Sequence, residues 1–384
     1  MIIIGASVYQ QDFHFHPCNV TVTGDRITRI GPSSERDASG LANETVINAE
    51  GKYLIPGLID VHMHGWGGVG CDQADPEKLK TIGRRLAQEG VTGYACTLAS
   101  EPDEHAFAAI AANLSMARQE EKKRTGARML GFHMEGPFLN PVKKGGMTLE
   151  YLQKPSVDLL KQFIEASSFQ VKIMTIAPEI KGALDVIRYG ASKGIKMSIG
   201  HTMATSEEAE RGIEAGASRA THTFNAMAPF DHRKPGVLGT VLTDDRVQCE
   251  MISDLVHLNF RTCRLIYRAK GPDKVTLITD SDLLAGLKQE EIPKEYPVIM
   301  KDAAYLPNGT LCGSIISLMK GMQNMVSIGI PLEDAVRMAS YNPARDLGVE
   351  KDYGSIDVGK AADMVILNKD LSVDSVFVGG TKLR

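Results

Sequence analysis

Two stretches of the sequence place a pair of histidines one residue apart. "LIDVHMHGWGG" contains His62 and His64 at the end of an apolar run, and "DFHFHPC" contains His14 and His16. Residues two apart on a strand share one face, so either pair could present two imidazole nitrogens to a divalent metal ion. The pair His14 and His16 alternates with phenylalanines, and no further cluster of ligand-type residues follows it. We therefore predict that His62 and His64 take part in chemistry and that the earlier pair faces solvent.

Other residues of metal-ligand type recur at one position of the pattern, the end of an apolar run just before the chain turns. They are His133, Glu135, His201, His222, His257 and Asp280. One histidine in an apolar run is more often packed in the core than bound to a metal. Six of the ten histidines in such places are hard to explain by packing, because buried imidazoles need partners.

Histidine combined with carboxylate is the ligand set of Zn(II), Fe(II) or a similar ion, and a catalytic site leaves one position open to water. Such a site predicts a hydrolase. A bound metal ion lowers the pKa of its water to about 7 and polarises the scissile carbonyl, so no serine or cysteine nucleophile is needed.

The elements that must position these residues are eight apolar runs between residues 58 and 280. They are "LIDVHMH", "TGYACTL", "ARMLGFHMEG", "VKIMTIAPE", "KMSIGH", "ATHTFNA", "QCEMISD" and "KVTLITD". Segments with apolar residues at helical spacing, such as "PEKLKTIGRRLAQEG", separate most of them. Eight such repeats predict an α/β fold, a closed parallel (β/α)8 TIM barrel with its active site at the C-terminal ends of the strands. An open doubly wound sheet is the alternative.

The two ends of the chain read as short strands separated by turn residues. We expect residues 1–53 and 354–384 to pair into a small discontinuous β-sandwich domain, and residues 54–353 to form the barrel.

The composition limits the partners. The formal net charge is −4, with 43 basic and 47 acidic residues and no long run of one sign, so we expect no nucleic-acid partner. No stretch of about 18 apolar residues stands together, which argues against a membrane span, and the N-terminus lacks the pattern of a signal peptide. The six cysteines are scattered without a disulfide or zinc-thiolate spacing, so we expect reduced thiols and a cytoplasmic protein.

With these residues in view, the chain resembles the amidohydrolase superfamily and, within it, the N-acetylglucosamine-6-phosphate deacetylase family over nearly its whole length. The matching segments are "GKYLIPGLIDVHMHG", "GFHMEGPFLNPVKKGG", "SIGHTMAT", "THTFNAMAPFDHRKPG", "TLITDS" and "GSIDVGKAADMVIL". The resemblance implies a main divalent metal held by Glu135, His201 and His222. It also implies that Asp280 is the general base that takes a proton from the attacking water and later delivers it to the leaving amine.

The family is divided over a second metal, so the resemblance implies one or two ions per chain. Members with His-x-His on the first strand can bind the second ion there, which assigns it to His62 and His64 with Glu135 or Asp280 as the bridge. Many amidohydrolases bridge two metals with a carboxylated lysine on the fourth strand. This chain has "IMTIAPE" at that place, and Glu135 is the natural substitute.

The resemblance also implies a sugar phosphate substrate and a homodimer, with one or more phosphate contacts reaching across the subunit interface. The phosphate would meet the backbone at Asn225 and Ala226, the guanidinium of Arg233, and His257. Arginine suits phosphate because its planar fork donates two parallel hydrogen bonds. The sugar would meet two loops, formed by Gly146, Met147, Leu311, Cys312 and Gly313.

Three departures from the family pattern concern the sugar pocket and leave the metal ligands intact. Met147 offers a thioether where the family often has histidine or glutamine, Leu255 replaces a glycine in "SDLVH", and "TDSDLLAG" replaces an alanine-rich loop. The expected reaction is deacetylation of N-acetylglucosamine 6-phosphate. N-acetylgalactosamine 6-phosphate or a cyclic amide is the alternative substrate, and a non-catalytic amidohydrolase-like scaffold is disfavoured because the ligands are present.

Overall fold

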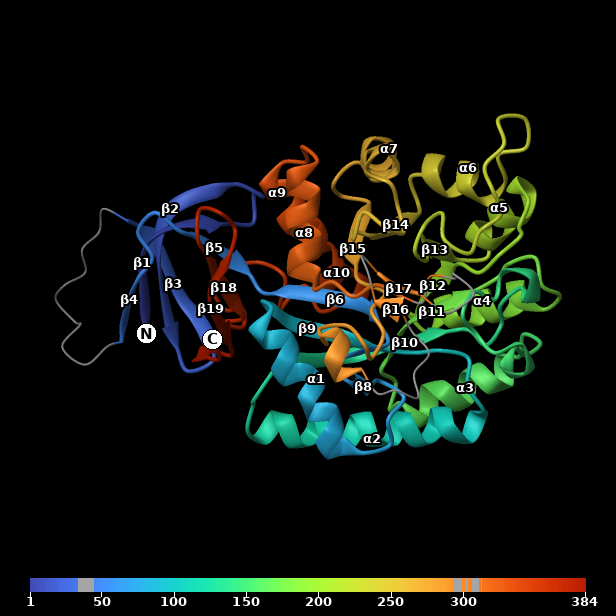
Figure 1. Cartoon of the computed structure of the whole chain (residues 1–384), viewed down its shortest axis with the longest axis horizontal. Coiled ribbons are helices and arrows are strands. Elements are labelled where there is room, and N and C mark those ends of the chain that lie inside the picture. The colour runs from blue at the N-terminus through green and yellow to red at the C-terminus, as the bar shows by residue number, and fades with distance from the viewer. Residues whose placement is uncertain (34–44, 293–298, 301–302, 306–310, 312) are drawn as a thin grey trace.

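The computed structural model describes residues 1–33, 45–292, 299–300, 303–305, 311 and 313–384. These residues form a barrel surrounded by helices and a separate β-sheet beside it, and both ends of the chain lie in that separate sheet (Figure 1). The chain therefore leaves the small sheet once, builds the barrel, and returns.

The barrel wall is an eight-stranded parallel sheet, which confirms the predicted (β/α)8 architecture. Its strands, in spatial order, are β15 (Val275–Ile278), β14 (Gln248–Ile252), β13 (Ala217–Ala220), β12 (Lys196–Ile199), β11 (Val171–Ile176), β10 (Arg128–Glu135), β9 (Val91–Leu98) and β6 (Leu58–Met63). The wall closes where the first strand meets the residues after the last, through a parallel bridge between Met63 and Ser281. The amide of Asp280 also donates to the carbonyl of His62 at 2.9 Å. Closure brings His62 and Asp280, which are 218 positions apart in the sequence, to one mouth.

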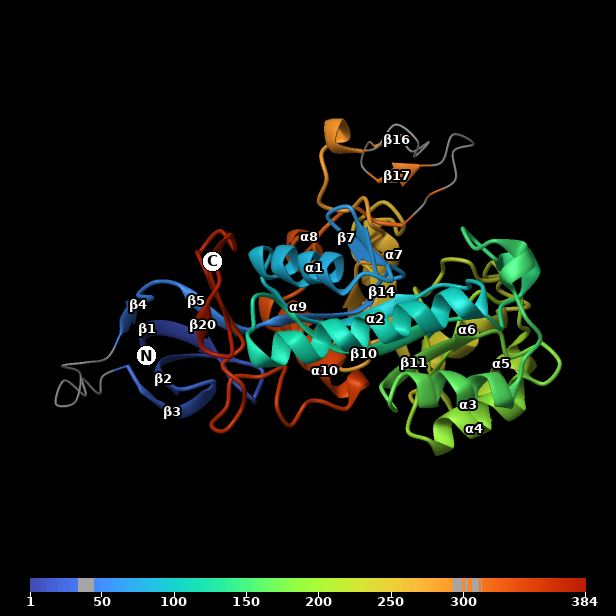
Figure 2. The ribbon, with the colours of Figure 1, turned by 90° about the horizontal axis from the view of Figure 1, so that it is seen from below.

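Helices pack against this wall, and all except the last of them cover its outside (Figures 1 and 2). They are α1 (Pro76–Gln88), α2 (Asp103–Lys122), α3 (Val157–Ala166), α4 (Ala183–Ser192), α5 (Ser206–Glu214), α6 (Gly236–Thr243), α7 (Phe260–Lys270), α8 (Leu318–Ser327), α9 (Leu332–Ala339) and α10 (Tyr341–Leu347). Their ends follow local signals: Thr205 and Glu208 form a capping box at the start of α5. Apolar residues at helical spacing, such as Leu79, Ile82 and Leu86 of α1, face the strands and are buried.

Helix α10 has a special place, because it contributes to the core inside the barrel. Its Ala344 and Leu347 pack with apolar side chains from six barrel-strand positions: Ile59, Val61, Ala95, Ile173, Ile252 and Ile278. This cluster packs helix α10 against the barrel strands that position the polar side chains described below.

The separate sheet joins the two ends of the chain, as expected. Its strand order is β20 (Thr381–Lys382), β19 (Val373–Val378), β18 (Met364–Leu367), β5 (Tyr53–Pro56), β1 (Ile2–Tyr9), β2 (Phe15–Thr23) and β3 (Arg26–Pro32), with β4 (Val46–Asn48) paired to β1. A bridge between Arg26 and Ala361 curls the sheet back on itself around its own apolar core. His14 directly precedes β2 and His16 lies within it, so the pair belongs to the small sheet, away from the barrel mouth. His14 is exposed, and His16 is half-buried with its Nε2 2.7 Å from Oδ2 of Asp12.

Short elements leave the barrel wall at its loops. They are the hairpin of β7 (Gly65–Trp66) and β8 (Val69–Gly70), the 3-10 turns Pro141–Lys143, Leu149–Tyr151 and Gln289–Glu291, and the pair β16 (Ile299–Met300) and β17 (Ala304–Tyr305). Figure 2 shows β16 and β17 outside the barrel wall.

One predicted strand was wrong in its position. The run "ATHTFNA" was expected to be the sixth barrel strand, but the strand is the preceding segment Ala217–Ala220 and the run itself forms a turn. The reason lies in the backbone, because His222, Phe224 and Ala226 all have positive φ angles, of 29°, 81° and 50°. An extended strand excludes such angles.

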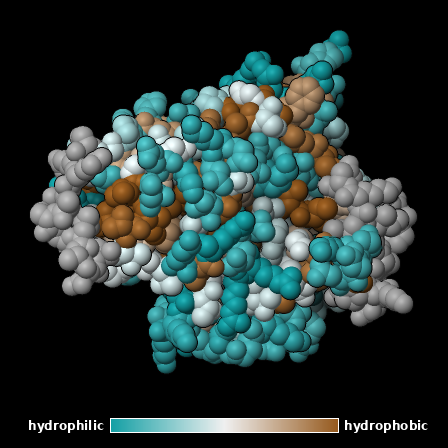
Figure 3. Space-filling model, turned by 60° about the vertical axis from the view of Figure 1, so that its left-hand side comes forward, coloured by the Kyte–Doolittle hydropathy of each residue, from teal (hydrophilic) through white to brown (hydrophobic). Residues whose placement is uncertain are grey.

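The surface is mixed. Figure 3 shows one face on which hydrophilic residues dominate and hydrophobic residues emerge in separate patches. Among the described residues, none of the helices combines the length and the apolar character that crossing a membrane requires.

Candidate metal centre

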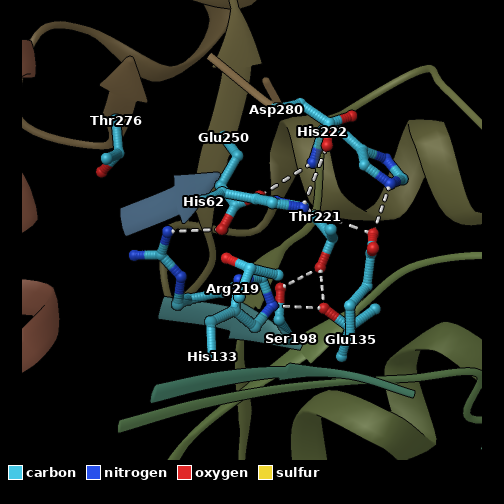
Figure 4. Close-up of polar contacts among 12 residues, drawn as sticks. His62, His133, Glu135, Ser198, Arg219, Thr221, His222, Glu250, Thr276 and Asp280 are labelled. Atoms are coloured by element: carbon cyan, nitrogen blue, oxygen red, sulfur yellow. Dashed lines mark hydrogen bonds and ion pairs between the residues drawn. The ribbon is translucent and has the colours of Figure 1, made fainter. Parts of the chain in front are cut away.

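Six ligand-type side chains meet at the C-terminal mouth of the barrel. They come from five of its strands, within or up to two residues after each strand: His62, His64, Glu135, His201, His222 and Asp280. Figure 4 shows His62, Glu135, His222 and Asp280 pointing toward one another from separate strands. The sequence pattern predicts these residues at one rim of the barrel, and the structure brings them together there.

The backbone aims three of these side chains in the same way. His201, His222 and Asp280 each follow a strand and have φ angles of 47°, 29° and 50°. A left-handed conformation costs a residue with a β-carbon on the order of 1–3 kcal/mol, and such strain clusters at functional sites. At these three positions the left-handed backbone lies just beyond the end of the strand, and it directs the side chain of the residue itself over the barrel mouth.

Three donor atoms form a nearly equilateral triangle. Glu135 Oε1 lies 3.1 Å from Nε2 of His201 and 3.1 Å from Nε2 of His222, and the two Nε2 atoms are 3.0 Å apart. All three side chains are at most 6% exposed. Donors about 2.1 Å from one tetrahedral ion would lie about 3.4 Å apart, so the triangle is close to the size that a metal ion requires.

The protonation pattern of His201 agrees with a metal ligand. Its Nδ1 is 2.7 Å from the carbonyl oxygen of Lys143 and must donate to it, so the neutral ring presents a lone pair at Nε2. That lone pair faces the carboxylate oxygen of Glu135 at 3.1 Å. Two acceptors at this distance repel unless a cation or proton lies with them, and the described residues at this triangle therefore fit a divalent ion.

A second donor group shares the other oxygen of Glu135. His64 Nε2 lies 3.1 Å from Glu135 Oε2 and 3.4 Å from Asp280 Oδ1, and His62 Nε2 lies 3.3 Å from the same Asp280 oxygen. His62, His64 and Asp280 could hold one ion between them. Oε1 of Glu135 also lies 3.4 Å from Nε2 of His62, so the Glu135 carboxylate faces both donor groups, as a bridging carboxylate would.

The electrostatics of the mouth favour positive charge. Burial alone would raise the pKa of Glu135 and of Asp280, but His62 and the other histidines around them together outweigh burial and hold both well below their usual range. Burial lowers the pKa of His64, yet hydrogen bonds to Asp280 and Glu135 raise it to about 10. In the metal-free protein protons on histidine supply the charge that these carboxylates demand, and a divalent cation would supply it instead.

His133 does not join the cluster, although it ends the same apolar run as Glu135. Its ring packs edge-on against His62 at 4.5 Å, and its Nε2 is 2.8 Å from the hydroxyl of Thr175. That hydroxyl continues through Thr221 to Ser198, at 2.8 and 2.6 Å. Figure 4 shows this polar ladder below the carboxylates, with Ser198 and Thr221 labelled.

Some of the predicted substrate residues lie in loops next to the donor residues. Asn225 and Ala226 are in the turn that begins at His222, and the amide of Asn225 donates to the carbonyl of His222 at 2.8 Å. An added β-carbon on Gly313 would lie 2.9 Å from the carbonyl oxygen of Asp280, which places that loop against the predicted base. Leu311 bridges to Tyr305, and Cys312 lies outside the described residues.

The other substrate candidates are His257, Arg233, Gly146 and Met147. His257 is 7% exposed, and its Nδ1 lies 2.6 Å from Asp254. Arg233 is exposed in the loop before α6, with its amide on Asp231. Gly146 is exposed and Met147 is half-buried in the loop that follows Lys143. Gly145 of the same loop approaches the ring of His201.

Sequence reasoning missed two buried charges behind the cluster. Glu250 lies within β14 and is 0% exposed, and Arg219 lies within β13 and is 1% exposed. A signal existed, because both are charged residues inside segments that otherwise read as buried strand, and buried charges are rare unless paired.

Comparison with known proteins supports this geometry. The family model for amidohydrolases matches residues 53–383. The N-acetylglucosamine-6-phosphate deacetylase of Bacillus subtilis (strain 168) is 35% identical over 344 residues, covering 89% of this chain and 87% of that protein. The N-acetylgalactosamine-6-phosphate deacetylase of Escherichia coli O157:H7 is 31% identical over 344 residues, covering 88% and 89%.

The fold comparison gives the same answer over the whole chain. The crystal structure of N-acetylglucosamine-6-phosphate deacetylase from Pasteurella multocida matches with a TM-score of 0.90 at 32% identity, covering 99% of this chain and 98% of that one. With the barrel, the donor cluster and these likenesses in agreement, the chain belongs to the amidohydrolase family.

Proposed function

We propose that this chain is a metal-dependent deacetylase that hydrolyses N-acetyl-D-glucosamine 6-phosphate to D-glucosamine 6-phosphate and acetate. The observation that carries the chemistry is the triangle of Glu135, His201 and His222 donor atoms, 3.0 to 3.1 Å apart at the barrel mouth. The choice of substrate is supported by the deacetylases that the chain resembles over most of its length.

In this proposal Glu135, His201 and His222 hold the main ion, and His62 and His64 hold a second one with Glu135 or Asp280 as the bridge. Both Zn(II) and Fe(II) suit imidazole and carboxylate donors. A bound divalent ion would polarise the amide carbonyl and acidify water at the site.

The chain's own residues then move the proton. Asp280 is 18% exposed, against 3% for Glu135, so its carboxylate is the one that water and substrate reach within the donor cluster. It takes a proton from the attacking water while the water oxygen bonds to the acetyl carbon. It returns that proton to the nitrogen as the carbon–nitrogen bond breaks, and acetate and the amine leave.

The phosphate end of the substrate needs donors that the cluster does not use. We assign it to Arg233, His257 and the backbone at Asn225 and Ala226, with Gly146, Met147 and the loop of Leu311, Cys312 and Gly313 beside the sugar. Support comes from the family resemblance and, for the loops of Gly146 and Gly313, from the approach of Gly145 to the ring of His201 and of Gly313 to the carbonyl of Asp280. The same resemblance supports a homodimer, and the scattered cysteines support a cytoplasmic setting.

A second candidate substrate has its own support. N-acetylgalactosamine 6-phosphate differs from the first substrate at one hydroxyl, and a relative of 31% identity is named for it. The departures at Met147 and Leu255 fall in the expected sugar pocket, where such a difference would be read.

The deciding experiment measures acetate and free amine from both epimeric sugar phosphates and from N-acetylglucosamine without phosphate. The protein is stripped of metal and reloaded with Zn(II) or Fe(II). We expect the highest kcat/KM for the glucosamine form, and a higher value for the galactosamine form would exchange the two candidates. A His16→Asn variant is the matched control, since it alters the look-alike His-x-His pair and should remain fully active. A protein that binds no ion and releases no acetate would favour a non-catalytic scaffold.

A further inference from the structure

Glu250 is a fully buried carboxylate that touches ligands of both donor groups without belonging to either. Its Oε2 is 2.9 Å from Nδ1 of His62 and accepts from the backbone amide of His222 at 3.1 Å. Its Oε1 accepts from the guanidinium of Arg219 at 2.9 Å. Figure 4 shows these contacts running from Arg219 toward the cluster. Neither the proposed proton transfer nor the substrate contacts use this residue.

The network behind Glu250 is anchored at the floor of the barrel. The other side of the Arg219 guanidinium is paired with Asp346 of helix α10. Asp346 also accepts from the hydroxyl of Thr276 at 2.7 Å and from the amide of Gln248 at 3.2 Å. Two carboxylates thus balance one buried guanidinium, and a chain of charge-assisted bonds links the last helix to the first barrel strand.

The bond to Glu250 sets which nitrogen of His62 is free. Because a carboxylate only accepts, Nδ1 of His62 must donate to it. Nε2 then points toward Asp280 at 3.3 Å and toward Glu135 at 3.4 Å, and it makes no hydrogen bond in the described part of the chain. A buried ring nitrogen aimed into a group of acceptors is oriented as a metal ligand would be.

Glu250, His62 and His133 could themselves be read as a third donor group, since their ligand atoms lie within 4.8 Å of one another. The contacts argue against an ion there. The guanidinium of Arg219 already binds the carboxylate of Glu250. An ion would therefore have to displace the proton on His62 Nδ1 and lie beside that positive charge. Glu250 is therefore placed to orient a ligand.

We propose that Glu250 is a positioning residue that fixes His62 with Nδ1 protonated, so that Nε2 is presented to a second divalent cation shared with His64 and Asp280. Arg219 and Asp346 hold Glu250 in that orientation. The inference rests on the proposed function for the presence of a second ion. Removing such an outer hydrogen-bond partner of a metal-bound histidine typically lowers metal affinity by about 10- to 100-fold.

The test compares Glu250→Leu with Glu250→Gln by counting ions per chain after equilibration at graded free Zn(II). We expect wild type to bind two ions and Glu250→Leu to bind the weaker ion about 10- to 100-fold less tightly. Glu250→Gln should rescue much of the loss. The amide oxygen of glutamine can still accept from two donors, Nδ1 of His62 and the backbone amide of His222. The amide nitrogen then faces Arg219, so only that one contact of Glu250 is lost.

A control separates positioning from general destabilisation. Arg128→Met breaks the pair of Arg128 with Asp363, 2.8 Å apart, at the opposite end of β10 from Glu135. Seven strand residues place that pair about 23 Å from the cluster. This variant should lose stability and keep both ions. Equal loss of the second ion in Arg128→Met and Glu250→Leu would overturn the proposal, as would wild-type affinity in Glu250→Leu.

A second measurement needs no variant and covers the case in which Glu250→Leu does not fold. In zinc-loaded wild type with ¹⁵N-labelled histidine, NMR should show a proton on Nδ1 of His62 and none on Nε2. The opposite tautomer would overturn the proposal. Acetate release is assayed on the same sample. An active enzyme with one ion would remove this inference and leave the proposed function standing. An inactive enzyme with two ions would remove the proposed function and leave this inference standing.

Discussion

Replacing Asp280 by asparagine removes a negative charge and a proton acceptor while keeping the shape of the side chain. Asp280 Oδ1 lies 3.3 Å from Nε2 of His62 and 3.4 Å from Nε2 of His64. Those histidines outweigh the effect of burial and hold the pKa of Asp280 below its usual range, so the carboxylate is available as a base at neutral pH. The amide of asparagine cannot take a proton there.

The size of the loss follows from the place of Asp280 in the cluster. One general acid/base group contributes about 10²- to 10⁴-fold, or about 2.7 to 5.4 kcal/mol of transition-state stabilisation. Glu135 cannot replace it readily, because both of its oxygens face histidine nitrogens at 3.1 Å and its side chain is 3% exposed. We therefore expect kcat/KM of Asp280→Asn to fall by at least about 10²-fold.

The assay is acetate release by metal-loaded wild type and variant, with ions per chain counted on the same samples. Asp280→Asn should keep the ion of Glu135, His201 and His222, since it alters none of the three. An Asp280→Asn enzyme within about tenfold of wild type would refute the assigned base, since it falls below the usual range for such a group. Inactivity accompanied by loss of every ion would show that Asp280 acts in metal retention instead.

Three further predictions test other parts of the account. Arg233→Ala should raise KM for the 6-phosphate substrate about 10- to 100-fold, because a bond to a charged group contributes about 1.5–3 kcal/mol; an equal effect on the unphosphorylated sugar would contradict a phosphate contact. Gly200→Ala places a methyl group 2.7 Å from Cβ of Thr221, so urea denaturation should show a loss of about 1–3 kcal/mol, whereas Gly146→Ala, with nothing within 4 Å, should show none. Burial, then the charge of His62, lowers the pKa of His133 to about 3, whereas the unfolded chain takes up that proton below about pH 6.5. The stability that His133 contributes to the metal-free protein is therefore fully present above about pH 6.5 and is lost as the pH falls toward 3, and His133→Gln should reduce the slope of stability against pH by up to about 1.4 kcal/mol per pH unit in that range; identical slopes would contradict a buried neutral imidazole.

Much of the architecture could be predicted because it depends on the spacing of apolar residues along the chain and on the composition of each segment. Alternating apolar runs and helical segments predicted the parallel barrel, and strand closure then brought His62 and Asp280 to the same mouth. The position of β13 could not be predicted in this way. Its true strand, "ASRA", is short and carries a charge, and the more apolar run after it turns at His222 with a positive φ angle.

The residues behind the cluster were harder to predict, since their roles depend on contacts between distant segments. Glu250 and Arg219 are 31 positions apart, and Asp346 follows almost 100 positions later. A single sequence shows these as isolated charges. The roles of Arg233 and His257 rest on family resemblance, because neither lies among the donor atoms at the mouth.

The most direct test of the account is to locate the ions in a crystal of the metal-loaded protein by anomalous diffraction at the zinc edge. The account predicts a peak about 2.0–2.2 Å from Glu135 Oε1 and from Nε2 of His201 and His222. It also predicts a second peak beside His62 and His64. A fully active crystal sample with no anomalous peak within reach of Glu135, His201 and His222 would contradict the central claim that these three side chains share one catalytic ion.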